Sequence, residues 1–299
     1  MTGALRALVA QELAQTAGTR AVAMAQALAA RYPGAARGVL FYGSCLRESQ
    51  LDGLMLDFYL IVSDYEAAYG KGWLACANAR VPPNVFPFAH EGLAAKYAVL
   101  SEDDFHRLCG EEADTVSVWA RFAQPSRLLW VADDAAQDRV VAAVARAAPA
   151  LLTLSAPVAQ ARGNTEFWDT GFALTYGAEL RAERTDRSAS IIASDPERYS
   201  RILAAAQSDG VFDPGRHYDM AEVARNAKRW RALRRRGKWM TLARLAKASF
   251  TFAGGIDYLA WKINRHAGTS ITIRPWQRRW PLLGALTLLP RLLLGGAIR

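Results

Sequence analysis

Hydrophobic and polar positions near the start of the chain follow two different periods. Residues 4–32 are Ala-rich with Leu and Val at helical spacing, which predicts two helices separated near Gly18. Two short apolar runs follow at residues 39–42 and 54–62, and Gly43-Ser44 with a polar loop lies between them. This pattern predicts a strand, a tight turn and a second strand.

One carboxylate, Asp57, lies inside the second apolar run. A buried carboxylate is costly unless it is paired or bound to a metal ion. Nucleotidyltransferases of the DNA polymerase β type are built on this plan. The backbone N–H groups of the turn and the Ser44 hydroxyl can hold triphosphate oxygens, and an acid on the next strand can hold Mg²⁺. The simpler alternative is a hairpin turn with a strand-end acid, since Gly-Ser alone decides nothing.

The rest of the first half alternates between helical and strand patterns. Strands are expected at residues 96–100 and 126–131, and residues 82–87 are expected to be a loop because of their prolines. Ser101 and Asp104 resemble a capping pair. Helices are predicted at residues 64–78, 135–148 with a stop at Pro149, 164–176, and over most of 196–252 with a loop at 209–216. The pattern is typical of an α+β fold.

Composition fits a globular protein with room for two domains. The 299 residues are 52% hydrophobic and 22% charged. The cysteines, Cys45, Cys76 and Cys109, are odd in number and widely spaced, which argues against a disulfide framework and a zinc site and favours a reducing compartment. The N-terminus does not resemble a signal peptide, and no apolar run reaches 18 residues, so no transmembrane segment is expected.

Positive charge is concentrated in the last quarter of the chain. The net charge is +9, yet from Arg225 onward 17 Lys and Arg residues stand against one acid, Asp257, and the first 224 residues are net negative. The natural partner of such a segment is a polyanionic surface, either an anionic membrane or nucleic acid. A solvated basic face without a partner remains the alternative.

Two C-terminal stretches carry further candidate residues. Residues 177–187 hold Glu179, Arg181 and Glu183, which would share one face of a strand but would form an ordinary solvated face of a helix. Residues 269–299 alternate basic and apolar clusters, and the apolar run at 280–290 is too short to span a bilayer. It suits a segment lying in the membrane interface, or else one packed on the protein's own core.

Several blocks occur in an order that resembles the mitochondrial-type phosphatidate cytidylyltransferases, the CDP-diacylglycerol synthases also described as translocator assembly and maintenance proteins. The blocks are Tyr42-Gly43-Ser44, Met55-Leu56-Asp57-Phe58, Lys96-Tyr97-Ala98-Val99, Arg121 to Arg127, Tyr176 to Arg181, and the basic residues 269–279. The resemblance covers about residues 35–290. Cys45 replaces a second Gly, which predicts a looser turn, and Glu179 replaces an Asp.

The resemblance implies a polymerase β-like nucleotidyltransferase domain at residues 1–190. A helical or winged-helix-like domain at 191–268 and an amphipathic, membrane-contacting tail at 269–299 would follow. The implied reaction converts CTP and phosphatidate into CDP-diacylglycerol and pyrophosphate, in the cytoplasm at the inner face of the cell membrane. The resemblance implies that Gly43, Ser44 and Tyr97 bind the nucleotide. Asp57 and Glu179 would bind Mg²⁺, with Asp52 as a further candidate ligand. Lys96 and Arg181 would neutralise the charge of the phosphates.

Two alternatives remain open at this stage. The same site could transfer nucleotides to a soluble acceptor or to RNA ends, because Lys228, Arg229 and residues 234–236 are also good phosphate ligands. The fold could instead be a non-catalytic adaptor for a membrane or nucleic acid. The apolar residues 292–294 beside the basic clusters favour a lipid and make nucleic acid the less expected partner.

Overall fold

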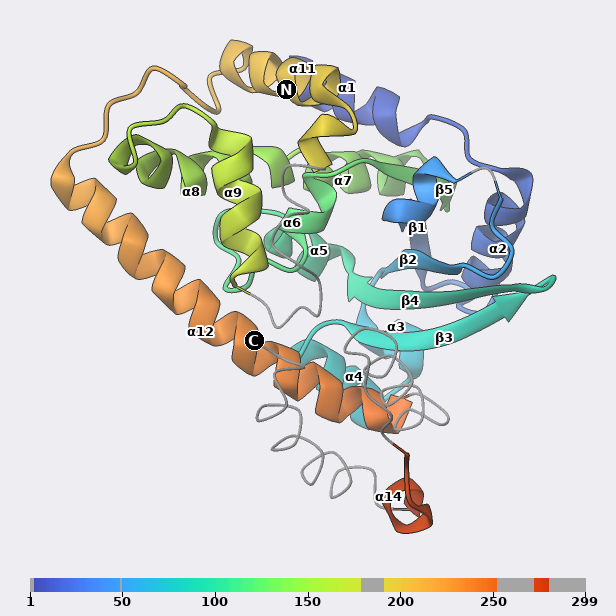
Figure 1. Ribbon diagram of the computed structural model, residues 1–299. Helices are drawn as coiled ribbons and strands as arrows, with labels where there is room; N and C mark the ends of the chain where they lie inside the picture. The colour runs from blue at the N-terminus through green and yellow to red at the C-terminus, as the bar shows by residue number, and fades with distance from the viewer. Residues whose placement is uncertain (1–2, 49, 179–190, 252–271, 280–299) are drawn as a thin grey trace.

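The computed structural model describes residues 3–48, 50–178, 191–251 and 272–279. Glu179, Arg181 and the rest of the predicted charged strand lie outside the described residues, as does the predicted interfacial segment at 280–290. The described part is a mixed α/β structure in which helices cover both faces of one sheet (Figure 1).

The sheet has five strands in the order β3-β4-β2-β1-β5. Their bounds are Ala36–Tyr42 for β1, Met55–Val62 for β2, Asn84–His90 for β3, Leu93–Ser101 for β4 and Ser126–Val131 for β5. β2 and β4 are parallel, and all other neighbouring strands are antiparallel. Parallel neighbours require a crossover connection, and here α3 (Tyr65–Tyr69), α4 (Trp73–Arg80) and β3 supply it.

Strand alternation sorts the apolar side chains onto two faces. Phe41 and Phe58 belong to a core cluster with α2 (Thr19–Ala29), whereas Leu40 and Tyr59 belong to a second cluster on the other face. That second face is covered by α5 (Glu102–Leu108), α6 (Trp119–Phe122) and α7 (Asp134–Val144), with α8 (Ala147–Ala161) and α9 (Phe167–Tyr176) behind them (Figure 1). β2 and β4 are therefore buried on both faces along most of their length.

The C-terminal helices contribute to the same core as the sheet. α1 (Ala4–Leu13) packs against α11 (Pro196–Ser208), and α12 (Met220–Thr251) runs along α8 and β3. Buried residues of both C-terminal helices, Tyr199, Ile202, Trp230 and Leu233, lie in the cluster that contains Leu40 and Tyr59. The described part of 191–251 thus shares a core with the first half, while the domain boundary near residue 190 stays a prediction.

One further short helix, α14, spans Pro275–Arg279.

Several sequence predictions are confirmed in detail. The two N-terminal helices separate at Gly18, and β5 has the expected bounds. Ser101 Oγ accepts a hydrogen bond from the Asp104 backbone N–H at 3.2 Å and caps α5. The single helix expected over 64–78 is divided into α3 and α4, because Gly70 has a φ of 70° that ends the first of them.

Two predictions that relied on proline were wrong. Pro87 lies within β3 rather than in a loop, which an edge strand permits because one side of its backbone pairs with no neighbouring strand. Pro149 lies in the first turn of α8 rather than ending a helix, and its missing N–H breaks no bond of α8 because the residue four positions earlier, Ala145, lies before the helix begins. Helix α8 was therefore not expected from the sequence.

The joined stretch of α7 and α8, Asp134–Ala161, is long and apolar enough to cross a membrane by length and composition alone. In the protein, 72% of its most apolar window is buried. Its buried side chains, among them Leu151, Leu152 and Leu154, belong to the main core cluster. Burial against the sheet and neighbouring helices thus accounts for its composition.

Candidate functional site

The turn after β1 lies directly against the Asp57 carboxylate. Gly43 has φ 93° and ψ −168°, a backbone region that is essentially restricted to glycine. A Cβ at this position would lie 3.5 Å from Asp57 Oδ2. Ser44 follows at the start of the short 3-10 helix η1 (Ser44–Arg47), and its side chain is exposed. The turn therefore exposes backbone and a hydroxyl beside a carboxylate.

Asp57 forms an ion pair with Lys96 from the neighbouring parallel strand. The two residues are register partners in β2 and β4, and Lys96 Nζ lies 3.0 Å from Asp57 Oδ1. Their side chains are 24% and 30% exposed, so both are within reach of a ligand from solvent. The carboxylate thus has one oxygen on the lysine and the other towards Gly43.

Tyr42 and Arg121 extend this group on the β1 side. Tyr42 is the register partner of Asp57 across β1 and β2, and its ring packs 5.3 Å from that of Tyr59. Burial raises the pKa of Tyr42 well above its usual value, and the nearby Asp57 charge raises it further, while a hydrogen bond from Arg121 acts in the opposite direction. Both residues belong to blocks of the resemblance, yet sequence reasoning gave neither a role.

The Cys45 side chain connects the turn to the start of β2. Its side chain is buried, and Sγ donates a hydrogen bond to the Met55 carbonyl oxygen at 3.6 Å, which joins η1 to the start of β2. Burial raises the pKa of the Cys45 thiol, and the Asp57 charge adds to the effect. The thiol therefore acts as a neutral packing group next to the site, and whether the turn is looser than one with a second Gly stays a prediction.

Two predicted site residues lie elsewhere. Asp52 pairs with Arg20 of α2, whose Nη1 is 2.9 Å from Oδ1 and 3.1 Å from Oδ2. Tyr97 follows Lys96 in β4 and so faces the opposite side of the sheet, where its hydroxyl lies 2.9 Å from that of Tyr32. Burial raises the pKa of Tyr97. The structure does not bring either side chain to the Asp57 carboxylate.

The two remaining candidates, Glu179 and Arg181, lie outside the described residues. Within the described ranges, no group of three or more His, Cys, Asp or Glu side chains is arranged to hold a metal ion. The described site consists of the Gly43-Ser44 turn, one carboxylate from Asp57, and the cations Lys96 and Arg121.

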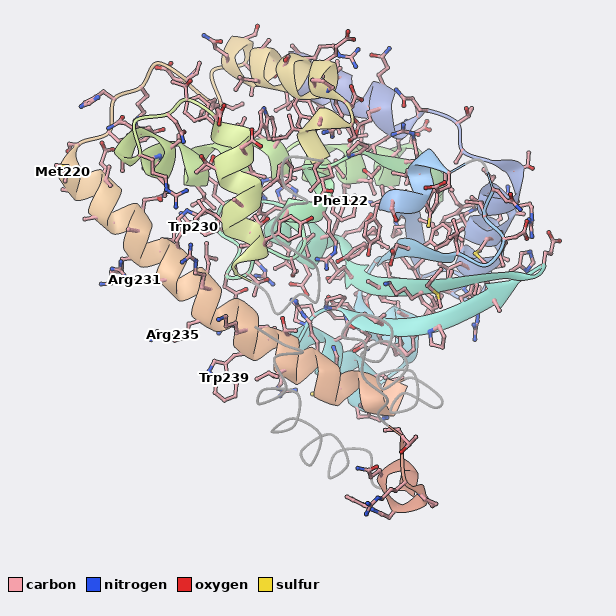
Figure 2. All side chains as sticks on the ribbon, viewed as in Figure 1. Phe122, Met220, Trp230, Arg231, Arg235 and Trp239 are labelled. Carbon is pink, nitrogen blue, oxygen red and sulfur yellow. The ribbon has the colours of Figure 1, made fainter. Side chains whose placement is uncertain are left out.

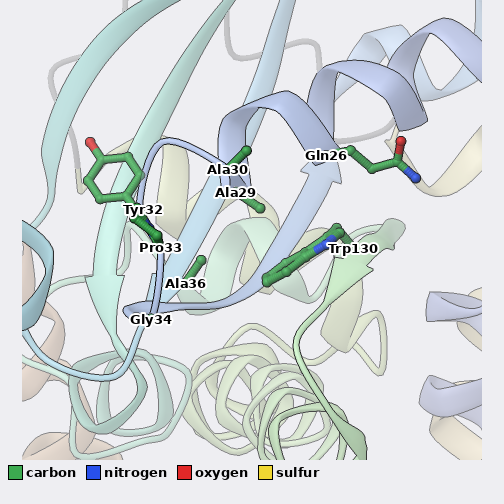
Figure 3. Close-up of a pocket in the computed structure, with 8 residues that line it drawn as sticks. All are labelled: Gln26, Ala29, Ala30, Tyr32, Pro33, Gly34, Ala36 and Trp130. Atoms are coloured by element: carbon green, nitrogen blue, oxygen red, sulfur yellow. The ribbon is translucent and has the colours of Figure 1, made fainter.

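Two surface hollows of the described chain lie away from this site. One of about 260 Å³ lies between α2 and the sheet, and Figure 3 shows Trp130 and Tyr32 on its walls. Another of about 310 Å³ lies on the other side of Trp130, between α1, β5 and α7. Both are lined mainly by apolar side chains and contain none of the residues of the Gly43–Asp57 site.

Comparison with solved structures finds distant neighbours, one of which is described below. The chain matches no protein-family profile and no curated protein sequence. A nucleotidyltransferase-like protein from Exiguobacterium sibiricum is similar over 93% of both chains, with 12% sequence identity and a TM-score of 0.28. A TM-score this low does not establish a common fold.

Proposed function

We propose that this protein is a Mg²⁺-dependent nucleotidyltransferase. The observation that supports it best is the Gly43 turn lying against the Asp57 carboxylate, with Lys96 Nζ 3.0 Å from the same carboxylate. Backbone N–H groups in a glycine turn can hold phosphate oxygens, and a lysine can neutralise their charge. A polyphosphate seated on the turn would therefore meet both an acid and a cation.

The donor chemistry of Asp57 fits a magnesium ion that arrives with its nucleotide. Mg²⁺ is commonly bound through one or two carboxylates together with substrate phosphates and water. Asp57 supplies one partly exposed carboxylate, and we assign the second to Glu179. When bound, the ion would neutralise phosphate charge and orient the nucleotide.

The proposed nucleotide is CTP and the proposed acceptor is phosphatidate, on the strength of the ordered blocks that resemble phosphatidate cytidylyltransferases. An oxygen of the phosphatidate phosphate forms a new bond to the α-phosphorus of CTP, and the bond from that phosphorus to the β-phosphate oxygen breaks. Pyrophosphate leaves with the electron pair, and the lipid becomes CDP-diacylglycerol. The attacking phosphate is already an anion, so no strong general base is required.

In this reaction the protein positions the reactants and neutralises charge. Gly43 and Ser44 would hold the triphosphate, and the Lys96 ammonium beside Asp57 would neutralise the charge of a phosphate oxygen. Arg181 supplies a further cation. The reaction would occur at the inner face of the cell membrane, which the basic C-terminal quarter favours.

The test is transfer of labelled cytidylate by the full-length protein from CTP to phosphatidate in vesicles, with Mg²⁺. We expect labelled CDP-diacylglycerol, and a loss of about 100-fold or more in Asp57→Asn, because the change removes the metal-binding charge while keeping the shape. Asp138→Asn is the matched control, since the Asp138 side chain is 80% exposed and, among the described residues, forms its ion pair with Arg6.

Three outcomes separate the proposal from its alternatives. Near-normal turnover in Asp57→Asn would contradict the site. Label transferred to RNA or to a soluble phosphate, but not to phosphatidate, would retain the nucleotidyltransferase and reject the lipid acceptor. A wild-type chain with neither transfer nor Mg²⁺-dependent CTP binding would be a non-catalytic adaptor.

A further inference from the structure

The inner face of α12 fixes this helix to the body of the protein. Trp230 and Leu233 are buried in the main core, and Trp230 Nε1 donates a hydrogen bond to the Leu154 carbonyl at 2.8 Å. Gly237 allows close backbone contact, because a Cβ there would lie 2.2 Å from the Ala178 carbonyl oxygen. These contacts fix the rotation of the helix about its axis, and they therefore also determine which side chains lie on its outer face.

That outer face carries a row of cations that ends in tryptophan. Arg231, Arg235 and Trp239 are spaced four residues apart, and Figure 2 shows all three projecting away from the protein body. Lys228 is exposed on the same face. Trp239 is 70% exposed. Met220, at the start of the helix, is 82% exposed. We call the set Lys228, Arg231, Arg235 and Trp239 the outer row.

The charge of the outer row is not balanced by the described structure. α12 contains ten Lys and Arg residues and a single acid, Glu222, whose carboxylate is paired with Arg216. Other cations of the helix have partners, since Arg236 pairs with Asp114 and Arg229 donates to the Glu111 carbonyl. No described carboxylate pairs with Lys228, Arg231 or Arg235.

We propose that the outer row is a docking surface for an anionic membrane. The cations complement a surface of lipid phosphates, and an exposed tryptophan at the end of the row is suited to the headgroup layer. The row lies on one continuous helix, about 17 Å long from Lys228 to Trp239 at 1.5 Å per residue. A straight row of this kind fits a flat surface. Single-stranded nucleic acid is normally held in a groove with several stacking rings, and the outer row has only one ring.

Docking through α12 would also position the proposed active site. Near its C-terminal end, Arg244 Nε donates to the Pro82 carbonyl at 2.7 Å and Lys247 Nζ to the Pro83 carbonyl at 2.9 Å. β3 begins at the next residue and pairs with β4, which carries Lys96. The proposal that α12 docks on an anionic membrane depends on the proposed function in one respect only, namely the choice of phosphatidate as the anionic lipid.

The experiment measures co-sedimentation of the full chain with phosphatidylcholine vesicles, with and without phosphatidate, at low and high salt. Each cation near an anionic membrane surface strengthens binding about fivefold. We therefore expect Arg235→Glu to weaken binding to phosphatidate vesicles at least about fivefold, and Arg231→Glu/Arg235→Glu at least about 25-fold, because the introduced carboxylates also repel the surface. Trp239→Ala should mainly reduce the binding that persists at high salt, because apolar insertion is not screened.

Arg201→Glu is the matched control, since Arg201 is exposed on α11, has no described ion-pair partner, and gives the same change in charge. It should bind vesicles within about twofold of the wild type. Transfer of cytidylate to a short-chain, soluble phosphatidate reports separately on the active site and should be unchanged in all variants. RNA binding by the same variants is measured in parallel. Wild-type vesicle binding by Arg231→Glu/Arg235→Glu would overturn the proposal, and loss of RNA binding with vesicle binding retained would instead assign the outer row to nucleic acid.

Discussion

Lys96 reaches Asp57 across the only parallel pair of strands in the described sheet, with Nζ 3.0 Å from Oδ1. The two residues lie in register, so neither side chain has to bend towards the other. A partly exposed ion pair contributes little to stability, typically below about 1 kcal/mol. The pair is therefore expected to matter little for the free energy of unfolding.

Lys96→Met should lower kcat/KM for CTP by about 100-fold, because the phosphates lose a cation in the site. The free energy of unfolding should change by less than about 1 kcal/mol, because the pair is partly exposed. Steady-state kinetics and urea unfolding measure the two effects. A variant with unchanged kinetics would show that Lys96 only neutralises Asp57.

Gly43→Ala should lower both stability and activity. Its φ of 93° with ψ −168° is strained for any residue with a side chain, at a cost of about 1–3 kcal/mol. The new methyl group would also lie 3.5 Å from Asp57 Oδ2, on the surface proposed for the triphosphate. Thermal unfolding and the cytidylate transfer assay report on the two consequences.

Gly34→Ala is the control for this variant. Gly34 has a φ of 76° with no atom near the added Cβ, and it lies away from Asp57, beside the hollow in Figure 3. It should lose a similar amount of stability and keep full activity. Equal activity in the two variants would contradict a role of the Gly43 turn in binding.

Arg198→Ala should destabilise the fold by about 3–5 kcal/mol, because it leaves Glu12 without its partner in a buried setting. The pair is only 6% and 13% exposed, and Arg198 Nη1 also donates to the Ala123 carbonyl at 3.0 Å. Arg6→Ala, at an exposed pair with Asp138, should cost less than about 1 kcal/mol. Urea unfolding of both variants compares them, and equal costs would contradict the buried pair's role in holding α1 and α11 together.

Lys247 should make stability depend on pH. Burial, with a smaller contribution from the neighbouring Arg244 charge, lowers the pKa of Lys247 to about 7. Between about pH 7 and the ordinary lysine pKa of 10.5, the unfolded chain binds the proton more tightly than the folded chain. Stability contributed by this group is therefore absent below pH 7 and rises towards pH 10.5.

Unfolding free energies of wild type and Lys247→Met across this interval measure the effect, since the difference between the two proteins cancels every other titrating group. The wild type should gain stability relative to the variant as pH rises. A difference that stays constant from pH 7 to 10 would show that the buried ammonium costs nothing in the fold.

The strand–turn–strand unit could be predicted because its signals are local. Apolar runs, the Gly-Ser turn and the embedded Asp57 all lie within residues 39–62, and the Ser101 cap spans only three residues. Asp57 and Lys96 were both named as site residues, and the structure brings them into contact. This contact depends on pairing of β2 with β4, for which a single sequence gives no local signal.

The wrong predictions share a physical cause in tertiary context. Pro87 is tolerated because β3 is an edge strand, and Pro149 because it lies in the first turn of α8. The presence of a proline alone does not predict either location. Tyr97 follows Lys96 in sequence, but strand alternation places it on the opposite face with Tyr32. Proximity in a motif therefore did not imply proximity in space.

The parallel pairing of β2 and β4 also has a kinetic consequence. Asp57 and Lys96 are 39 positions apart, and all of α3, α4 and β3 lies between them. Contacts between distant segments form slowly, because the intervening chain must lose entropy before pairing stabilises it. During refolding from urea, the local β1–turn–β2 unit should thus precede the complete site, and CTP binding should recover later than the signal of the first antiparallel strands.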